Sequence, residues 1–303
     1  MIDLAVTTTP FMDLTFIGLE AIPRLGEERF AGDVHRSPGG GAITATGATR
    51  LGLSTVLTAP TGSDQEGAEL RAALQAEGVE LVEPHAGRTA TTVVMPADGD
   101  RAMVTFDPGV RSRREDLAAL DPRAVVCGPV DLELVPEGAA VYLSLGDEEA
   151  RALAGRPPEG PAAALVVNEA EALRITGEAD AARAAAQLAV LVPVAVVTRG
   201  PKGAVAASGG AEVSAPGVDV GPAVDTTGAG DLFLAAYVWA DLHGAELEER
   251  LTWAVLYAAM SVSVPTALGG AATRDRLIAE GTRLGLPAPA ASVSRSSSKE
   301  GWK

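Results

Sequence analysis

Residues 224–237 bring together the residue types that phosphoryl-transfer chemistry requires. Gly228, Ala229 and Gly230 stand directly before Asp231 and an almost wholly apolar run. Small residues before a buried helix leave backbone N–H groups uncovered, and with the positive end of the helix dipole these groups form an anion site. Asp231 is then placed to take a proton from a hydroxyl that attacks a phosphoryl group held by those amides. The alternative is that Asp231 only caps the helix, a position that Asp favours.

The composition argues against several other classes of function. The chain has 303 residues, 47% hydrophobic and 21% charged, which is typical of a soluble globular protein at the upper size limit of one domain. Its net charge of -16 argues against binding to nucleic acid or to an anionic membrane surface. The single cysteine, Cys127, excludes an internal disulfide and a multi-cysteine metal site, and three scattered histidines argue against a histidine metal site.

The sequence shows no targeting or membrane-spanning segment. Residues 2–6 read as a first strand rather than as part of a signal peptide. No apolar run approaches the ~20 uncharged residues that span a bilayer. We therefore expect a soluble, cytoplasmic protein that acts on a small molecule and on neither a membrane nor a nucleic acid.

Short β-branched runs alternate with Ala/Leu-rich helical stretches along the chain. The expected strands are residues 2–6, 55–59, 79–82, 124–127, 140–145, 164–167, 194–198 and 204–208. The expected helices are residues 42–51, 67–77, 147–154, 170–176, 180–191, 232–242 and 247–264. This alternation implies βαβ units, a mostly parallel sheet and helices on both of its faces. Ligands of such open α/β folds bind outside the carboxyl ends of the strands.

Two stretches, at about residues 11–38 and 88–106, interrupt that alternation. The second reads as two strands, 89–95 and 101–106, around an Asp-Gly turn, which is a good hairpin signal. We expect both stretches to pair into a small sheet that covers a site, because such a cover excludes water. A homodimer formed through this sheet is a further hypothesis. The tail, residues 286–303, is Pro/Ala-rich and then Ser-rich, and is expected to be disordered.

Four segments in order resemble the signatures of the ribokinase-like (PfkB) family of sugar and nucleoside kinases. Residues 224–237 match its C-terminal signature, and Gly39-Gly40-Gly41 followed by Ala45, Gly52 and Gly62 matches the N-terminal one. Asn168-x-x-Glu171 and Thr198-x-Gly200-x-x-Gly203 resemble its two nucleotide-side motifs. The resemblance covers roughly residues 1–285 as one kinase domain. It implies an α/β fold, the ribokinase-like three-layer sandwich with a mostly parallel central sheet and a small β lid.

The resemblance also implies where the acceptor binds. Asp13 would accept hydrogen bonds from two hydroxyls of a polyol, and the backbone of Gly39, Gly40 and Gly41 would approach the substrate closely. Without the resemblance, Asp13 reads as a solvated loop residue and the glycines as an ordinary loop before a helix.

On the nucleotide side, the resemblance implies that Asn168 and Glu171 organise Mg²⁺ through its water ligands. The alternative is a helix-capping box, which has the same Asn-x-x-Glu pattern. Thr198, Gly200 and Gly203 would form a turn against the nucleotide, together with Asn168. Lys202 and Arg199 stand near the same turn, and for them a solvated position is equally compatible with the sequence.

The implied reaction is direct, in-line transfer of the γ-phosphoryl group of ATP. Asp231 would deprotonate the acceptor hydroxyl, and the amides of Gly228, Ala229 and Gly230 would stabilise the developing charge. Some family members bind a monovalent cation such as K⁺ beside this loop, at positions that here hold Asp225 and Thr227.

Two departures from the family concern the acceptor. Ile43 stands where the N-terminal signature normally has Asn, and Phe11 stands where ribokinase has another Asn, two residues before Asp13. Both changes replace hydrogen-bonding amides with apolar surface, which disfavours ribose itself. A sugar-like acceptor stays the first hypothesis because sugars are the commoner acceptors in the family. A nucleoside acceptor and a non-catalytic ligand-binding homologue are the alternatives.

Overall fold

The computed structural model describes residues 2–97, 100–154 and 162–286. Within these residues one large sheet contains β1 (Leu4–Val6), β4 (Thr55–Leu57), β5 (Glu80–Leu81), β8 (Ala124–Cys127), β9 (Ala140–Ser144), β10 (Ala164–Asn168), β11 (Ala195–Thr198), β12 (Ala204–Ser208) and β13 (Ala211–Ala215). Their order is β13-β12-β11-β10-β9-β8-β1-β4-β5. All neighbours from β11 to β5 are parallel, and β12 and β13 add an antiparallel edge. The mostly parallel sheet expected from the sequence is therefore confirmed.

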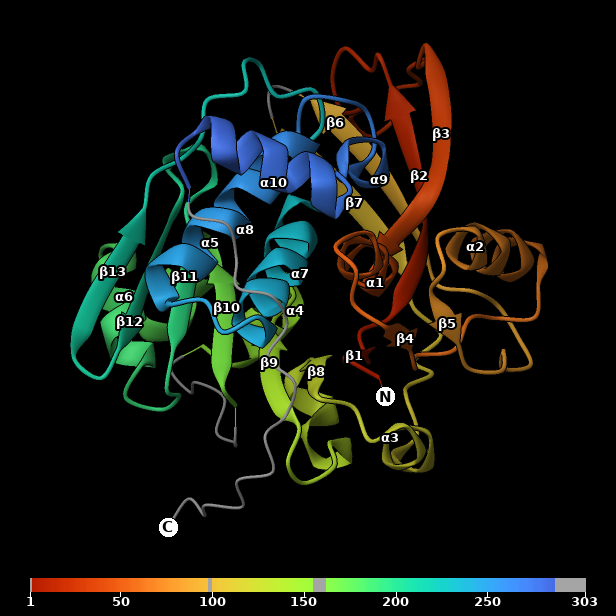
Figure 1. The fold of residues 1–303 in the computed structure, drawn as a ribbon. Coiled ribbons are helices and arrows are strands. Elements are labelled where there is room, and N and C mark those ends of the chain that lie inside the picture. Colours follow the sequence, from red (N-terminus) through yellow and green to blue (C-terminus); the bar gives the residue numbers. More distant parts are fainter. Residues whose placement is uncertain (1, 98–99, 155–161, 287–303) are drawn as a thin grey trace.

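The helices lie in two layers, one on each face of this sheet (Figure 1). They are α1 (Gly41–Arg50), α2 (Gln65–Ala76), α3 (Arg114–Leu120), α4 (Asp147–Ala152), α5 (Glu169–Thr176), α6 (Ala181–Leu188), α7 (Ala229–Leu242), α8 (Leu247–Ser261), α9 (Ala267–Gly270) and α10 (Arg274–Arg283), with short 3-10 turns at Pro129–Leu134 and Gly200–Lys202. Successive residues of β1 point to opposite faces. Leu4 and Val6 join the apolar cluster of α1, α7 and α8, whereas Ala5 joins that of α5 and α6. This is the expected three-layer sandwich.

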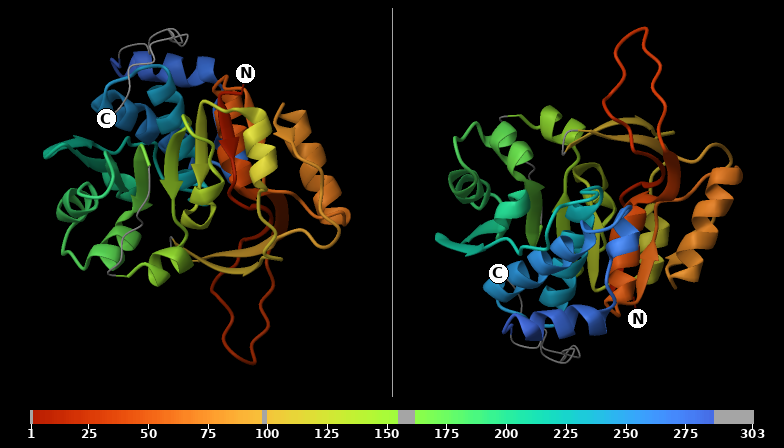
Figure 2. Two further views of the ribbon diagram at one scale, coloured as in Figure 1. Left: turned by 90° about the horizontal axis from the view of Figure 1, so that it is seen from below. Right: turned by 90° about the horizontal axis from the view of Figure 1, so that it is seen from above.

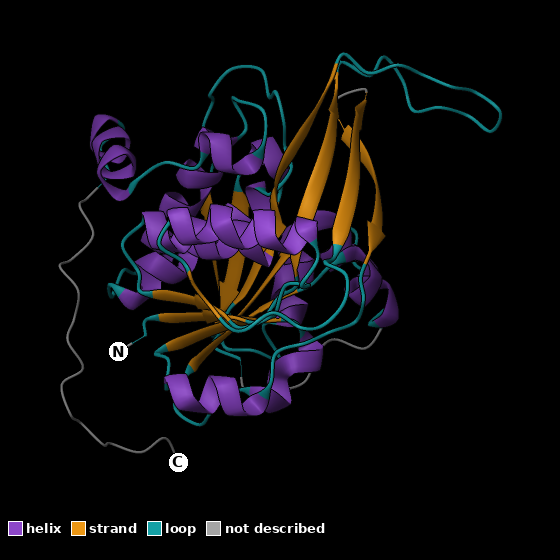
Figure 3. Cartoon of the chain, turned by 90° about the vertical axis from the view of Figure 1, so that its right-hand side faces the viewer, coloured by secondary structure: helices purple, strands orange, loops and turns teal. Residues whose placement is uncertain are grey.

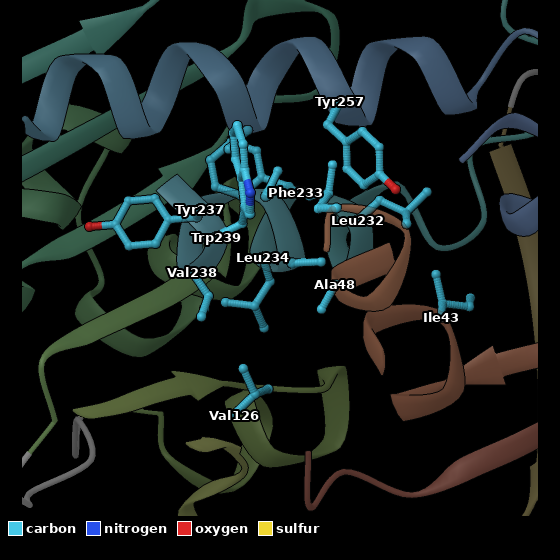
Figure 4. Packing of buried hydrophobic residues seen from close by; sticks show 14 of the residues in the cluster. Ile43, Ala48, Val126, Leu232, Phe233, Leu234, Tyr237, Val238, Trp239 and Tyr257 are labelled. Carbon is cyan, nitrogen blue, oxygen red and sulfur yellow. The ribbon is translucent and has the colours of Figure 1, made fainter. Parts of the chain in front are cut away.

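Helices α1, α7 and α8 form the thickest part of the core. Ala48 of α1, Leu232 of α7 and Tyr257 of α8 meet in one apolar cluster (Figure 4). A Cβ added to Gly47 would lie 2.6 Å from Leu232 Cδ2, so this glycine lets α1 and α7 approach closely. The relative position of the first turns of these two helices is fixed by that packing.

The two interrupting stretches pair into a second, four-stranded sheet, which confirms the small sheet expected from the sequence. It contains β2 (Pro10–Ile17), β3 (Asp33–Gly40), β6 (Thr91–Ala97) and β7 (Asp100–Phe106), in the order β3-β2-β6-β7. The register aligns Asp13 with Thr92 and Thr92 with Thr105. Because side chains alternate along β7, Arg101 lies on the same face as Thr105 and Asp13. The expected turn residues 98–99 and the expected disordered tail from residue 287 lie outside the described residues.

A long loop, residues 18–32, joins β2 to β3 and extends away from the rest of the molecule (Figures 2 and 3). Its large apolar side chains Leu25 and Phe30 are exposed. None of the expected site residues lies on this loop. No helix among the described residues is both long and apolar enough to cross a membrane.

Candidate active site

The expected site segments meet at the carboxyl edge of the central sheet, beneath the small sheet. The N–H of Gly41 donates to the carbonyl of Thr9 at 3.0 Å, so α1 begins beside the end of β1. Asn168 at the end of β10 is paired in register with Thr198 at the end of β11. Parallel strands end at one edge of a sheet, which is where ligands of this class of fold bind.

Helix α7 begins at Ala229 rather than at Leu232, where the sequence placed its start. Gly228 precedes it with φ 73°, a left-handed backbone that brings Ala229 and Gly230 directly into the first helical turn. In the described part of the chain, the N–H groups of Gly228 and Gly230 meet no backbone acceptor. They are therefore available, with the helix dipole, to an anion.

Asp231 lies in the first turn of α7 and is half-buried. The Thr44 hydroxyl of α1 donates a hydrogen bond to Asp231 Oδ1 at 3.2 Å. Burial raises the pKa of Asp231 to about 6, while the Thr44 hydrogen bond and the charge of Arg101 act to lower it. A carboxylate with a pKa near neutrality is ionised at physiological pH and still binds a proton well, as a general base must. Asp231 is not the N-cap residue of α7, which is Gly228, although its carboxylate also forms a hydrogen bond with its own backbone N–H in the first turn.

Arg101 is a site residue that the sequence did not reveal. It projects from β7 of the small sheet, and its Nη1 donates to Thr226 Oγ1 at 3.2 Å. Its charge also acts on Asp231. The small sheet thus places a cation beside the loop that would hold an anion. The only local signal was a charged residue just after the expected hairpin turn, a common solvated position.

Asp13 is buried in the small sheet, with 6% of its surface exposed. Burial raises its pKa to about 7, and the charges of Asp231 and Asp225 add to that rise while a hydrogen bond with Thr92 opposes it. A Cβ added to Gly39 would lie 2.2 Å from both Asp13 carboxylate oxygens. The space that this glycine leaves free is therefore occupied by the Asp13 side chain. In the same way, Gly40 and Gly41 lie against the Phe11 ring and the Thr8 carbonyl.

We predict that Asp13→Asn stabilises the protein at high pH. Because the pKa of Asp13 in the folded state, about 7, lies above its ordinary value of 3.8, folding binds a proton between these pH values. The free energy of unfolding therefore falls as pH rises from 4 to 7, by roughly 2–4 kcal/mol from this residue. Urea unfolding at pH 8 should show the variant to be more stable than the wild type, with the difference vanishing near pH 4. An equal difference at both pH values would contradict this electrostatic account.

The two apolar residues that replace family amides occupy different positions. Ile43 is 1% exposed and lies behind Gly228: a Cβ added to that glycine would be 2.6 Å from Ile43 Cδ1. Ile43 therefore supports residues 228–231, which we call the anion loop, from within the core. Phe11 is half-buried, with its ring against Gly40, and it keeps partial exposure in the strand that carries Asp13.

We predict that Gly228→Ala disrupts the loop, whereas Gly230→Ala is tolerated by the fold. At Gly228 a Cβ would meet Ala267 Cβ at 2.5 Å and Ile43 Cδ1 at 2.6 Å, in a backbone conformation with φ 73°. At Gly230 a Cβ meets no atom within 4 Å. Thermal unfolding should show a loss of about 2–3 kcal/mol for Gly228→Ala and little change for Gly230→Ala. Equal losses in the two variants would show that the loop is not packed in this way.

On the nucleotide side, Asn168 and Glu171 form a capping box. The N–H of Asn168 donates to Glu171 Oε2 and the N–H of Glu171 donates to Asn168 Oδ1, both at 2.9 Å. The turn Gly200–Lys202 leads to Gly203, where a Cβ would lie 2.1 Å from the Ala215 carbonyl oxygen. Lys202 is exposed, and the half-buried Arg199 donates from Nη2 to the Lys202 carbonyl at 3.3 Å.

Asp225 fastens the anion loop to the segment after α8. Its Oδ1 accepts from the N–H of Thr227 at 2.8 Å, and its Oδ2 accepts from the N–H of Thr266 at 3.0 Å. The buried Thr227 Oγ1 has no hydrogen-bond partner within the described residues. Those residues contain no group of three or more His, Cys, Asp or Glu side chains that could hold a metal ion.

Comparison with known proteins identifies both the family and the fold. A family model described as pfkB family carbohydrate kinase matches residues 11–129 and 158–273, more than half of the chain. Ribokinase from Bacillus subtilis (strain 168) is 29% identical over 277 residues, covering 84% of this chain and 91% of that protein. Ribokinase from Arabidopsis thaliana, solved with ribose and ATP, has a TM-score of 0.76 at 24% identity, covering 92% of this chain and 98% of that one. Adenosine kinase from Sinorhizobium meliloti has a TM-score of 0.73 at 21% identity, covering 91% and 98%.

Proposed function

The chain belongs to the pfkB family of carbohydrate kinases, and we propose that it transfers the γ-phosphoryl group of ATP to a hydroxyl of a small sugar-like acceptor. One observation carries this proposal. The half-buried carboxylate of Asp231 lies at the start of α7, beside the uncovered N–H groups of Gly228 and Gly230. Arg101 of the small sheet places a positive charge beside this carboxylate. We further propose that residues 1–285 form the kinase domain, which acts in the cytoplasm because ATP is its donor.

In the proposed reaction, Asp231 takes the proton of the attacking hydroxyl while the uncovered N–H groups of Gly228 and Gly230 bind the transferring phosphoryl group. The Ala229 N–H, which donates to the Thr226 carbonyl at 3.4 Å, would join them by exchanging that acceptor for a phosphoryl oxygen. Arg101 neutralises part of the negative charge that the phosphoryl oxygens carry. Its Nη1 already contacts the Thr226 hydroxyl at 3.2 Å, which places the guanidinium beside this loop, and a hydrogen bond from a guanidinium to a phosphoryl oxygen is strengthened by the two charges. The new bond joins the acceptor oxygen to phosphorus, the bond to the ADP oxygen breaks, and the proton stays on Asp231 until solvent removes it.

The residues proposed for Mg²⁺ fit an ion that keeps its water ligands. Glu171 is a buried carboxylate at the carboxyl edge of the sheet, and one of its oxygens already accepts the Asn168 N–H. Direct coordination by several side chains finds no support among the described residues. Mg²⁺ is ordinarily held by phosphates, waters and one or two protein oxygens, and when bound it would neutralise charge on the nucleotide phosphates. Asn168 and Glu171 would orient its waters.

For a monovalent cation such as K⁺, we propose Asp225 and Thr227 as contributing residues. The buried Thr227 hydroxyl lacks a partner within the described residues, and the Asp225 carboxylate beside it retains lone pairs after accepting two N–H groups. A cation placed there would stabilise the loop that carries the amides.

The acceptor site proposed here contains Asp13, which would accept hydrogen bonds from two hydroxyls, next to the segment Gly39–Gly41. The Bacillus subtilis relative supports a sugar. The partly exposed ring of Phe11 supports a second candidate, a nucleoside, because an aromatic face stacks well on a base. Homodimer formation through the small sheet is a separate proposal, supported by Val34, Val104 and Phe106, which are exposed on the face opposite Asp13.

The proposal is tested by measuring ADP release from ATP and Mg²⁺ with a panel of sugars, sugar phosphates and nucleosides. We expect one class of acceptor to stimulate ADP release well above the acceptor-free rate. Bound ATP with no stimulation by any member of the panel would favour the non-catalytic alternative.

A further inference from the structure

Two adjacent residues in the first turn of α1 contact the two ends of the anion loop. Ile43 lies behind Gly228, and the Thr44 hydroxyl donates to Asp231 Oδ1 at 3.2 Å. Both side chains are 1% exposed. They reach the loop from a position about 190 residues earlier in the chain, so the contact is created by the fold and not by local sequence.

We propose that Thr44 is a positioning residue, which holds the Asp231 carboxylate in the orientation that receives the acceptor's proton and favours its ionised form. The orienting part rests on the function proposed above. The effect on ionisation does not, because it follows from the hydrogen bond alone.

The packing makes Thr44 a stiff support. Residues 41–48 of α1 are all buried, and Gly47 allows the close approach of α1 to Leu232 and Ala235 of α7. Thr is β-branched, so its hydroxyl has few accessible rotamers in a helix. The Thr44 Oγ1 is therefore fixed relative to Asp231, and no loop has to close before the contact forms. The same helix starts at Gly41, two residues after Gly39, which lies against the Asp13 carboxylate, so the helix that supports the base begins beside the proposed acceptor site.

The charges around Asp231 leave Thr44 a distinct role. Asp13 from β2 is the nearby carboxyl group that responds to Asp231: the charges of Asp231 and of Asp225 raise the pKa of Asp13. Arg101 from β7 and the Thr44 hydroxyl are the two side chains that favour the ionised form. Arg101 belongs to the small sheet, which has to admit the acceptor, whereas Thr44 belongs to the core. Thr44 would hold the carboxylate ready whether or not the small sheet is in place.

The test uses the full chain with three variants. Thr44→Val removes the hydroxyl at nearly constant volume, and Thr44→Ser restores it. Thr46→Val is the matched control, because Thr46 is buried in the same helix and its hydroxyl has no partner within the described residues. Carboxyl ¹³C NMR of Asp-labelled protein follows the titration, and Asp231→Asn identifies the Asp231 signal by its loss.

We expect Thr44→Val to raise the Asp231 midpoint by about one pH unit, equivalent to about 1.4 kcal/mol. Thr44→Ser and Thr46→Val should keep the wild-type midpoint. In the kinase assay, the acid limb of kcat/KM should move up with the midpoint, and kcat at pH 8 should fall by roughly 10-fold from lost orientation. The KM for the acceptor should stay unchanged.

Each result separates this proposal from the proposed function. An unmoved midpoint in a folded Thr44→Val protein would overturn the role of Thr44, as would an equal shift in Thr46→Val. A moved midpoint with unchanged kcat at pH 8 would overturn the orienting part. A wild-type protein that supports no Asp231-dependent turnover would contradict the kinase assignment, while the NMR titration would still decide whether Thr44 controls the ionisation of Asp231.

Discussion

Asp231→Asn is expected to lower kcat by about 10²–10⁴-fold, the range that a positioned general base contributes. Asn has nearly the same shape and still accepts the Thr44 hydrogen bond, so the first turn of α7 should be retained. The uncovered amides are unchanged, and the affinity for ATP should therefore be close to that of the wild type. Stopped-time assays of kcat with calorimetric titration of ATP give both quantities on the same protein.

The same variant has an independent electrostatic signature. The charge of Asp231 helps to raise the pKa of Asp13, so its removal should let Asp13 titrate at lower pH than in the wild type. A variant that keeps kcat within about 10-fold of the wild type while showing this shift would remove Asp231 as the base. Such a result would leave the geometry of the site unchanged, and another group would have to accept the proton.

Arg101→Gln is expected to produce the second-largest loss, about 10²-fold in kcat with a small change in the KM for ATP. The reason is that a donor aimed at developing charge acts mainly in the transition state, where removal of one such group typically costs about 10²–10³-fold. Arg101→Lys should recover part of the activity, since it keeps the charge and loses the planar fork. Steady-state kinetics of the three proteins measure the effect.

The matched control for Arg101 is Arg88→Gln. The Arg88 guanidinium lies 4.8 Å from the centroid of the Phe106 ring in the same small sheet. Phe106 is paired with Thr91, whereas Arg101 is paired with Pro96, near the other end of β6 and β7. Its removal should leave kcat unchanged. A loss of similar size in both variants would mean that Arg101 acts through the stability of the small sheet and not through the phosphoryl group.

Local patterns in the sequence predicted most of the helices and strands and the possible anion site at Gly228, Ala229 and Gly230, whereas the other site segments were predicted from the resemblance to the family. Short runs of apolar residues predicted β8 and β12 to the residue, because a strand that is buried on both faces needs apolar side chains toward both helical layers. Outside the small sheet, the helices α3, α9 and α10 and the strand β13 were missed, and for two of these elements the physical reason is clear. The edge strand β13 is mostly exposed and so lacks a run of apolar residues, and α10 is rich in charged residues because it buries little beyond Leu277 and Gly281.

Side-chain partners were predictable only where they are local. Asn168 and Glu171 are three residues apart, and their capping box follows from that spacing. The contacts of Thr44 with Asp231 and of Arg101 with Thr226 join residues 187 and 125 positions apart, and no periodicity encodes them. Ile43 was read as acceptor surface because of its place in a signature, whereas the packing of α1 on α7 turns it toward Gly228.

The proposed activity is Asp231-dependent transfer of a phosphoryl group from ATP to an acceptor hydroxyl. The most direct test incubates [γ-³²P]ATP and Mg²⁺ with mixed sugars and nucleosides, with either the wild type or Asp231→Asn, and separates the labelled products. Asp231-dependent transfer predicts label in an organic acceptor with the wild type, little or none with the variant, and little label in inorganic phosphate. Label that appears only in inorganic phosphate, or equally with both proteins, would contradict it.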